Sequence, residues 1–127
     1  MGSPPFWRKL ETVGVYLVAL HSFMIGIMLI FATGWVLDFA GWTEVSNLFF
    51  PRQSGAFHLI LASGYVWEFR RHRTIGLMLL TKGLAVVFLL VMSPWEEAWS
   101  VPFSGVFDGL MLVGMAWFHR MARWDET

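Results

Sequence analysis

Two ionisable residues, Lys82 and Asp108, lie within stretches of sequence that are otherwise apolar enough to sit in lipid. Almost every other charged residue falls outside such stretches. A membrane tolerates a charged side chain at depth only when that side chain pairs, lines a water-filled cavity or holds a ligand. We therefore expect either an ion pair or a polar ligand site where these two residues meet.

Three further polar residues accompany this pair: Arg52, His58 and His21. At about 1.5 Å of rise per helical residue, His58 and Asp108 are expected about 6 to 8 Å below the outer surface. His21 and Lys82 are expected near mid-membrane, and Arg52 at the outer mouth. Together they would form a polar track with three open interpretations: a structural pair that fixes helix register, an outward-opening ligand pocket, or a proton path. No polar series continues to the inner surface, which disfavours a path across the membrane.

The elements that must position these residues are membrane helices. Of the 127 residues, 57% are hydrophobic and only 14% are charged, against about 25% charged in an ordinary soluble domain. A soluble domain of this length could not bury so much apolar surface. The sequence predicts an all-α, single-domain polytopic membrane protein with four transmembrane helices in a bundle. The approximate spans are 12–34, 54–69, 74–93 and 103–119.

The basic residues predict the orientation of these spans. Seven of the nine lysines and arginines fall at the chain ends or between the second and third spans, and Arg52 is the only basic residue on the opposite side apart from the intramembrane Lys82. By the positive-inside rule, both termini are expected in the cytoplasm, in a bacterial-type inner membrane. The inner arginines are expected to contact lipid head groups; they are Arg70, Arg71 and Arg73. Zero net charge and scattered basic residues argue against nucleic acid as a partner.

The outer link between the first two spans contains a helical repeat. Phe39, Trp42, Val45 and Phe49 recur every three to four residues, a pattern typical of a short amphipathic helix lying in the outer interface. An irregular loop over the bundle fits the same residues equally well.

Small residues in the fourth span indicate close helix packing. Gly105-x-x-x-Gly109 is a small-xxx-small pattern, which lets two helices approach closely. Packing within the bundle and packing against a partner subunit both fit this pattern.

The sequence offers little catalytic or cofactor chemistry. There is no cysteine, which excludes disulfides, thiolate metal sites and iron–sulfur clusters. Serine-nucleophile, HExxH and phosphate-loop patterns are absent, so neither an active site nor a metal site is expected. Haem is disfavoured, because it needs two histidines at one depth on facing helices. His21 is expected centrally, His58 near the outer side, and His119 in the inner interfacial belt.

The outer link enters the second span as Arg52-Gln-Ser-Gly55-Ala-Phe-His58, Lys82-Gly83 lies within the third span, and Asp108 follows Pro102 in the fourth. In these features, and over most of the chain, the protein resembles the DoxX-like superfamily of small four-helix bacterial membrane proteins. The resemblance implies the four-helix topology. It also implies a link to electron transfer, since that group includes a subunit similar to the membrane component of thiosulfate:quinone oxidoreductase. The basic residue of the third span is often arginine in this pattern, and lysine lacks its bidentate geometry.

Two classes of function fit these observations. The leading hypothesis is a non-catalytic integral membrane subunit that anchors or stabilises a larger membrane complex, respiratory or otherwise engaged in electron transfer. Its partners would be membrane lipids and either other integral membrane subunits or a second copy of this chain. The alternative is a quinone- or lipid-binding redox component with an outward-facing pocket at Arg52, His58 and Asp108. A transporter is a third hypothesis, and a chain this short would have to dimerise to provide alternating access.

Overall fold

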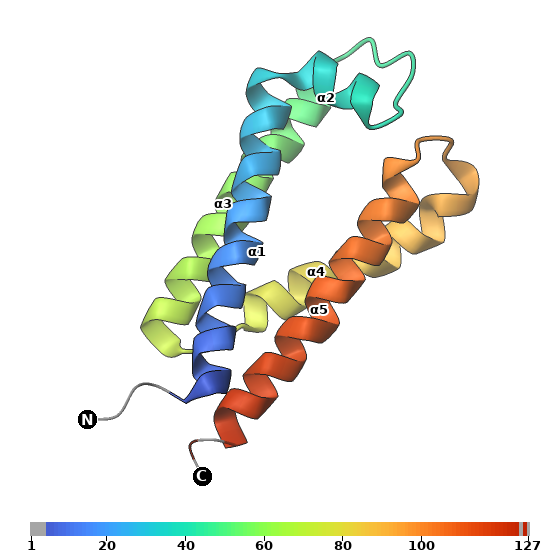
Figure 1. Cartoon of the computed structure of the whole chain (residues 1–127). Coiled ribbons are helices and arrows are strands. Elements are labelled where there is room, and N and C mark those ends of the chain that lie inside the picture. The colour runs from blue at the N-terminus through green and yellow to red at the C-terminus, as the bar shows by residue number, and fades with distance from the viewer. Residues whose placement is uncertain (1–4, 125, 127) are drawn as a thin grey trace.

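Apolar segments fold into helices in lipid because each backbone polar group must be satisfied within its own segment. The computed structural model describes residues 5–124 and 126. These residues form five α-helices and one 3-10 turn, and no strand occurs among them, which confirms the all-α class (Figure 1). The elements are α1 (Phe6–Phe31), α2 (Thr33–Phe39), α3 (Phe49–His72), α4 (Gly76–Met92), η1 (Ser93–Trp95) and α5 (Ser100–Trp124).

Three of the described helical segments are long and apolar enough to cross a membrane. They are α1, the segment Gly76–Trp95 formed by α4 and η1, and α5. The helix α3 has 24 residues but is less apolar, because Arg52 lies near its start and Arg70 and Arg71 near its end.

Two helices, α3 and α5, extend beyond the predicted spans at both ends, whereas α4 lies within its predicted span of 74–93. The helix α1 begins at Phe6, six residues before the predicted start, and ends at Phe31. The predicted ranges 54–69 and 103–119 lie inside the longer α3 and α5. Pro51 and Pro102 both occupy the first turn of a helix, where a missing N–H removes no intrahelical hydrogen bond.

The outer link is a short helix followed by an irregular loop. The helix α2 ends at Phe39, and no helix occurs over residues 42–48, so the helical repeat there does not form the interfacial helix it suggested. Gly41 adopts a φ of 88° and Glu44 a φ of 59°, which a helix cannot accommodate. The N–H of Gly41 donates to the carbonyl of Asp38, and that of Trp42 to the carbonyl of Leu37, which closes the end of α2.

The outer link also packs onto the connection between α4 and α5. The indole N–H of Trp99 donates to the carbonyl oxygen of Phe39 at 2.9 Å, and the two rings meet edge to face at 5.7 Å. A Cβ at Gly41 would lie 2.8 Å from the Trp99 ring. Glycine is therefore required there for its small size as well as for its positive φ.

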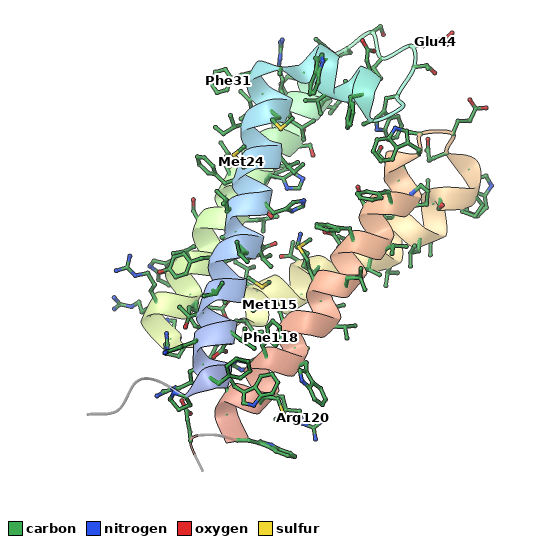
Figure 2. All side chains as sticks on the ribbon, in the orientation of Figure 1. Met24, Phe31, Glu44, Met115, Phe118 and Arg120 are labelled. Atoms are coloured by element: carbon green, nitrogen blue, oxygen red, sulfur yellow. The ribbon has the colours of Figure 1, made fainter. Side chains whose placement is uncertain are left out.

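The four long helices form two antiparallel hairpins. The helix α1 packs along α3, α4 packs along α5, and the hairpins meet mainly through α1 and α5. Figure 1 shows the hairpins close together at the end that holds both chain ends and diverging toward α2. The core lies at the close end, where Met115 and Phe118 of α5 face α1 (Figure 2). Its buried members include Val15, Val18, Tyr65, Phe69, Met78 and Met115.

Glycines permit the tightest helix contacts. A Cβ at Gly55 would lie 2.8 Å from the carbonyl oxygen of Gly26, so α1 and α3 touch backbone to backbone at this point. A Cβ at Gly105 would lie 2.9 Å from Leu90, and Gly109 faces Val86. The small-xxx-small pattern of α5 therefore serves packing against α4 within the chain.

Glu68 of α3 caps the start of α4. Its Oε1 accepts hydrogen bonds from the Thr74 hydroxyl at 2.7 Å and the Gly76 N–H at 2.9 Å. Its Oε2 accepts the Leu77 N–H at 2.9 Å. A carboxylate at this position satisfies N–H groups that have no partner within the helix and complements the helix dipole. Glu68 therefore sets where α4 begins and ties it to α3.

We expect Glu68→Ala to lower the free energy of unfolding by about 1 to 2 kcal/mol, the usual effect of losing a helix cap. Glu68→Gln should lose less stability, because the amide oxygen can still accept a hydrogen bond from one of the N–H groups. Thermal unfolding in detergent, monitored by circular dichroism at a helix wavelength, measures the stability of both variants. Glu97→Ala serves as the control, since that carboxylate is exposed and forms no salt bridge within the described part of the chain. Equal losses at the two positions would contradict the capping role.

Candidate functional site

The two intramembrane charges meet between α4 and α5. The Lys82 Nζ donates to the Asp108 Oδ1 at 2.9 Å, and the two side chains are only 5% and 14% exposed. Opposite charges at this distance compensate part of the large desolvation cost that each would carry alone. The pair therefore ties α4 to α5 near the middle of the second hairpin.

Two histidines of the first hairpin lie within electrostatic range of this pair. His21 on α1 and His58 on α3 lie close enough to Lys82 and Asp108 to interact with both charges, and His58 also interacts with His21. The His21 ring lies 5.1 Å from the ring of Phe107 on α5. Its Nδ1 is buried and has no hydrogen-bond partner within the described part of the chain. We call His21, His58, Lys82 and Asp108 the intramembrane polar cluster.

The structure corrects the predicted depth of the two histidines. Gly26 of α1 and Gly55 of α3 are in contact. Because the two helices are antiparallel, the depths of other residues can be compared by counting inward from this contact along each helix. His21 is five residues and His58 three residues inward, which places them within about 3 Å of one depth. The separation of a central His21 from an outer His58 is therefore wrong. Depth therefore gives no reason to disfavour haem at these two histidines.

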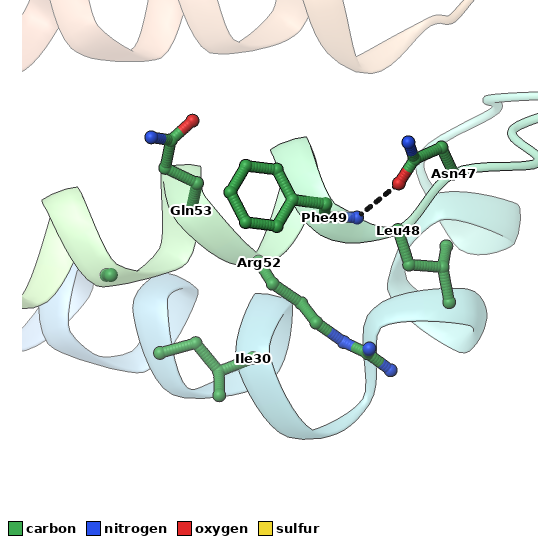
Figure 3. Close-up of a pocket in the computed structure, with 7 residues that line it drawn as sticks. Ile30, Asn47, Leu48, Phe49, Arg52 and Gln53 are labelled. Carbon is green, nitrogen blue, oxygen red and sulfur yellow. Dashed lines mark hydrogen bonds between the residues drawn. The ribbon is translucent and has the colours of Figure 1, made fainter.

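Arg52 does not join the polar cluster. Its Nε donates to the buried Thr33 hydroxyl at 3.3 Å, and its side chain lines a separate surface pocket at the outer end of α3 (Figure 3). This pocket has a volume of about 580 Å³. Asn47 forms part of its wall and accepts the Phe49 N–H through its side-chain oxygen at 2.9 Å. The predicted track from Arg52 to the polar cluster is thus interrupted.

The three inner arginines occupy different environments. Arg70 and Arg71 line a second shallow pocket on α3, together with Trp67. Arg73 instead terminates α3 with a φ of 55° and places its guanidinium over the Phe69 ring, 4.5 Å from the ring centre. Lipid contact by the three arginines, all of which are exposed, stays a prediction.

A second buried contact, between a carboxylate and a histidine, was not predicted from the sequence. Glu11 of α1 is 5% exposed, and its Oε1 contacts the Nδ1 of His119 on α5. His119 was assigned only to the interfacial belt. One sequence feature could have indicated this contact: Glu11 is an isolated acidic residue near Arg8 and Lys9, at the same end of the helices as His119. This contact joins the two hairpins at the close end.

We expect His119→Leu to destabilise the protein by about 3 kcal/mol, because the buried Glu11 side chain would lose its partner. Detergent unfolding by increasing sodium dodecyl sulfate, followed by helicity, measures the change. His72→Leu is the matched control, since His72 lies at the same end but is exposed. A loss at His72 as large as that at His119 would argue against a specific interaction with Glu11.

The described residues contain no group of three or more histidine, aspartate or glutamate side chains that could hold a metal ion. No protein-family model, curated protein or solved structure matches the chain. The function must therefore be argued from the geometry alone.

Proposed function

We propose that this protein is a non-catalytic integral membrane subunit that anchors or stabilises a larger membrane complex. It crosses a bacterial-type cytoplasmic membrane four times, with both ends of the chain in the cytoplasm. The assignment to the DoxX-like superfamily, and through it to an electron-transfer complex, is part of this proposal.

The observation that carries this proposal is the apolar surface of α4. Only 11% of its membrane-crossing window is buried inside the chain, and Leu84, Val87 and Val91 are each more than half exposed on one face. Such a face must be covered by lipid or by another helix. The charged groups of the polar cluster, by contrast, pair within the chain, which fits a structural use of Lys82 and Asp108.

A fourth crossing by α3 is supported by the spacing of its arginines. Arg52 and Arg70 are 18 residues apart, or about 27 Å of helix, close to the roughly 30 Å of a hydrocarbon core. Long basic side chains at both ends of such a segment can reach the two interfaces. Between them, Glu68 is the only aspartate, glutamate, lysine or arginine, and its carboxylate is engaged with the start of α4.

Purification of the tagged protein from its own membranes in mild detergent, with a mass-spectrometric inventory of the accompanying chains, tests the subunit role. Stoichiometric companions are expected. A photoreactive residue at Val87 on α4 should crosslink to one of them, and the same residue at Ile60 on α3 tests the other hairpin. A lone monomer or homo-oligomer with lipid adducts at both positions would contradict the proposal.

One observation favours a second candidate, a quinone- or lipid-binding redox component. The buried Nδ1 of His21 lacks a partner in the described chain, and a carbonyl or hydroxyl head group entering where the hairpins diverge would satisfy it. On this alternative, His21→Phe should remove any quinone that co-purifies with the protein. If the quinone content is the same in wild type and variant, the alternative fails.

A further inference from the structure

One face of α3 carries a shallow groove at its inner end. Ser63, Val66, Trp67, Arg70 and Arg71 line it, with a volume of about 510 Å³. These positions recur at the spacing of a single helix face. The distance from Arg70 to Ser63 along the axis is about 10 Å, so the groove runs from the charged end of the helix toward its apolar middle.

The positive charge of this groove is uncompensated. Neither Arg70 nor Arg71 has an acidic partner among the described residues. Glu68, the nearest acidic residue in the sequence, turns to the other side and binds the N-terminus of α4. The guanidiniums of Arg73 and Arg120 are used elsewhere, since they lie over the rings of Phe69 and Trp124.

Val66 and Trp67 form the apolar part of the groove. Trp67 is 62% exposed, and His72 packs edge-on against its ring at 5.7 Å. The Ser63 hydroxyl donates to the Leu59 carbonyl at 2.9 Å, so this hydroxyl is not available as a donor to a ligand. A tryptophan beside basic residues is typical of the boundary between head groups and acyl chains.

We propose that this groove binds an anionic phospholipid, with the phosphate between Arg70 and Arg71 and the first part of an acyl chain along Trp67 and Val66. Two adjacent guanidiniums match the charge and geometry of a phosphate. The apolar wall would contribute nothing to a free phosphate ion, which favours a lipid as the source of that phosphate. This inference goes beyond the subunit role and requires only that the inner end of α3 lies at a membrane surface.

The test uses the purified full chain in neutral detergent micelles that contain either phosphatidylglycerol or phosphatidylcholine. Native mass spectrometry counts the lipid retained at each concentration. We expect retention of phosphatidylglycerol and a roughly 30-fold weaker apparent affinity in R70Q/R71Q, about fivefold for each basic residue near the anionic lipid. The matched variant R73Q/R120Q removes the same charge from the same end and should bind nearly as wild type.

Each other result overturns the proposal. Equal weakening in both double variants would mean that only net charge matters. Equal retention of the two lipids would mean that the head-group charge is not recognised. Displacement of the lipid by inorganic phosphate at the same concentration would make the site a phosphate site without a lipid component. Circular dichroism of each variant establishes that the helices are retained.

Discussion

Replacing Lys82 by methionine is expected to lower the free energy of unfolding by about 3 to 5 kcal/mol, because Asp108 would remain buried with no opposite charge. Asp108→Leu should lose a similar amount, since it isolates the Lys82 ammonium, which is 4% exposed. The double variant K82M/D108L should recover most of the loss, because two well-packed apolar side chains often replace a buried ion pair without destabilisation. The single variants measure the cost in stability of leaving one buried charge unpaired. The double variant measures what the ion pair contributes to stability relative to two apolar side chains.

These free energies of unfolding can be measured in dodecyl maltoside micelles by adding increasing sodium dodecyl sulfate and monitoring the loss of helicity. Gly83→Ala is a suitable control, since a Cβ there meets no other atom within 4 Å. The charge swap K82D/D108K provides a second check and should restore assembly lost in each single swap. If neither double variant recovers stability, the direct interaction between Lys82 and Asp108 is not what holds α4 to α5.

The second large effect is expected at the contact between α1 and α3. Gly55→Val would place its Cβ 2.8 Å from the Gly26 carbonyl oxygen and 2.9 Å from the Ile30 side chain. A backbone atom cannot move aside as the end of a long side chain can, so the helices must separate. We expect a loss of about 3 kcal/mol, at the upper end for overpacked sites.

The matched control for this variant is Gly114→Val. It makes the same chemical change in a long helix, but nothing lies within 4 Å of the added Cβ. The same detergent unfolding measurement should show little change there. Similar stabilities of the two variants would mean that α1 and α3 do not depend on close approach at Gly55.

The sequence predicted the helical class well because hydropathy is a local property. Long apolar runs can satisfy their backbone groups only as helices, and α1, α4 and α5 follow from this rule. It also indicated Lys82 and Asp108 as the unusual pair, since charged residues inside such runs are rare. The distance of 2.9 Å between them required the structure.

Depth and helix boundaries were predicted less well, for a physical reason. Charged residues near the N-terminus were treated as lying outside the helix, yet Arg8 binds Glu126 at 2.5 Å and Glu11 contacts His119. The helix α1 begins at Phe6 and ends at Phe31, three residues before the predicted end of its span at residue 34. The helix α3 begins at Phe49, five residues before the predicted start at residue 54, so counting from residue 54 placed His58 too near the outer end.

The outer link was ambiguous because a helical repeat does not record backbone strain. Gly41 and Glu44 both adopt positive φ values, and the contact of Gly41 with Trp99 depends on a residue far along the chain. A pattern of apolar residues alone cannot contain that information. The loop alternative was available from the sequence, but only the tertiary contact selects it.

We propose that α3 crosses the membrane, which gives four spans with both ends of the chain in the cytoplasm. The chain has no cysteine, so single cysteines can be introduced directly at Lys9, Glu44, His72, Glu97 and Arg123. An impermeant thiol reagent applied to intact cells should label Glu44→Cys and Glu97→Cys, and label the other three only after permeabilisation. Labelling of His72→Cys and Arg123→Cys in intact cells, with Glu97→Cys protected, would mean three crossings and would contradict the account.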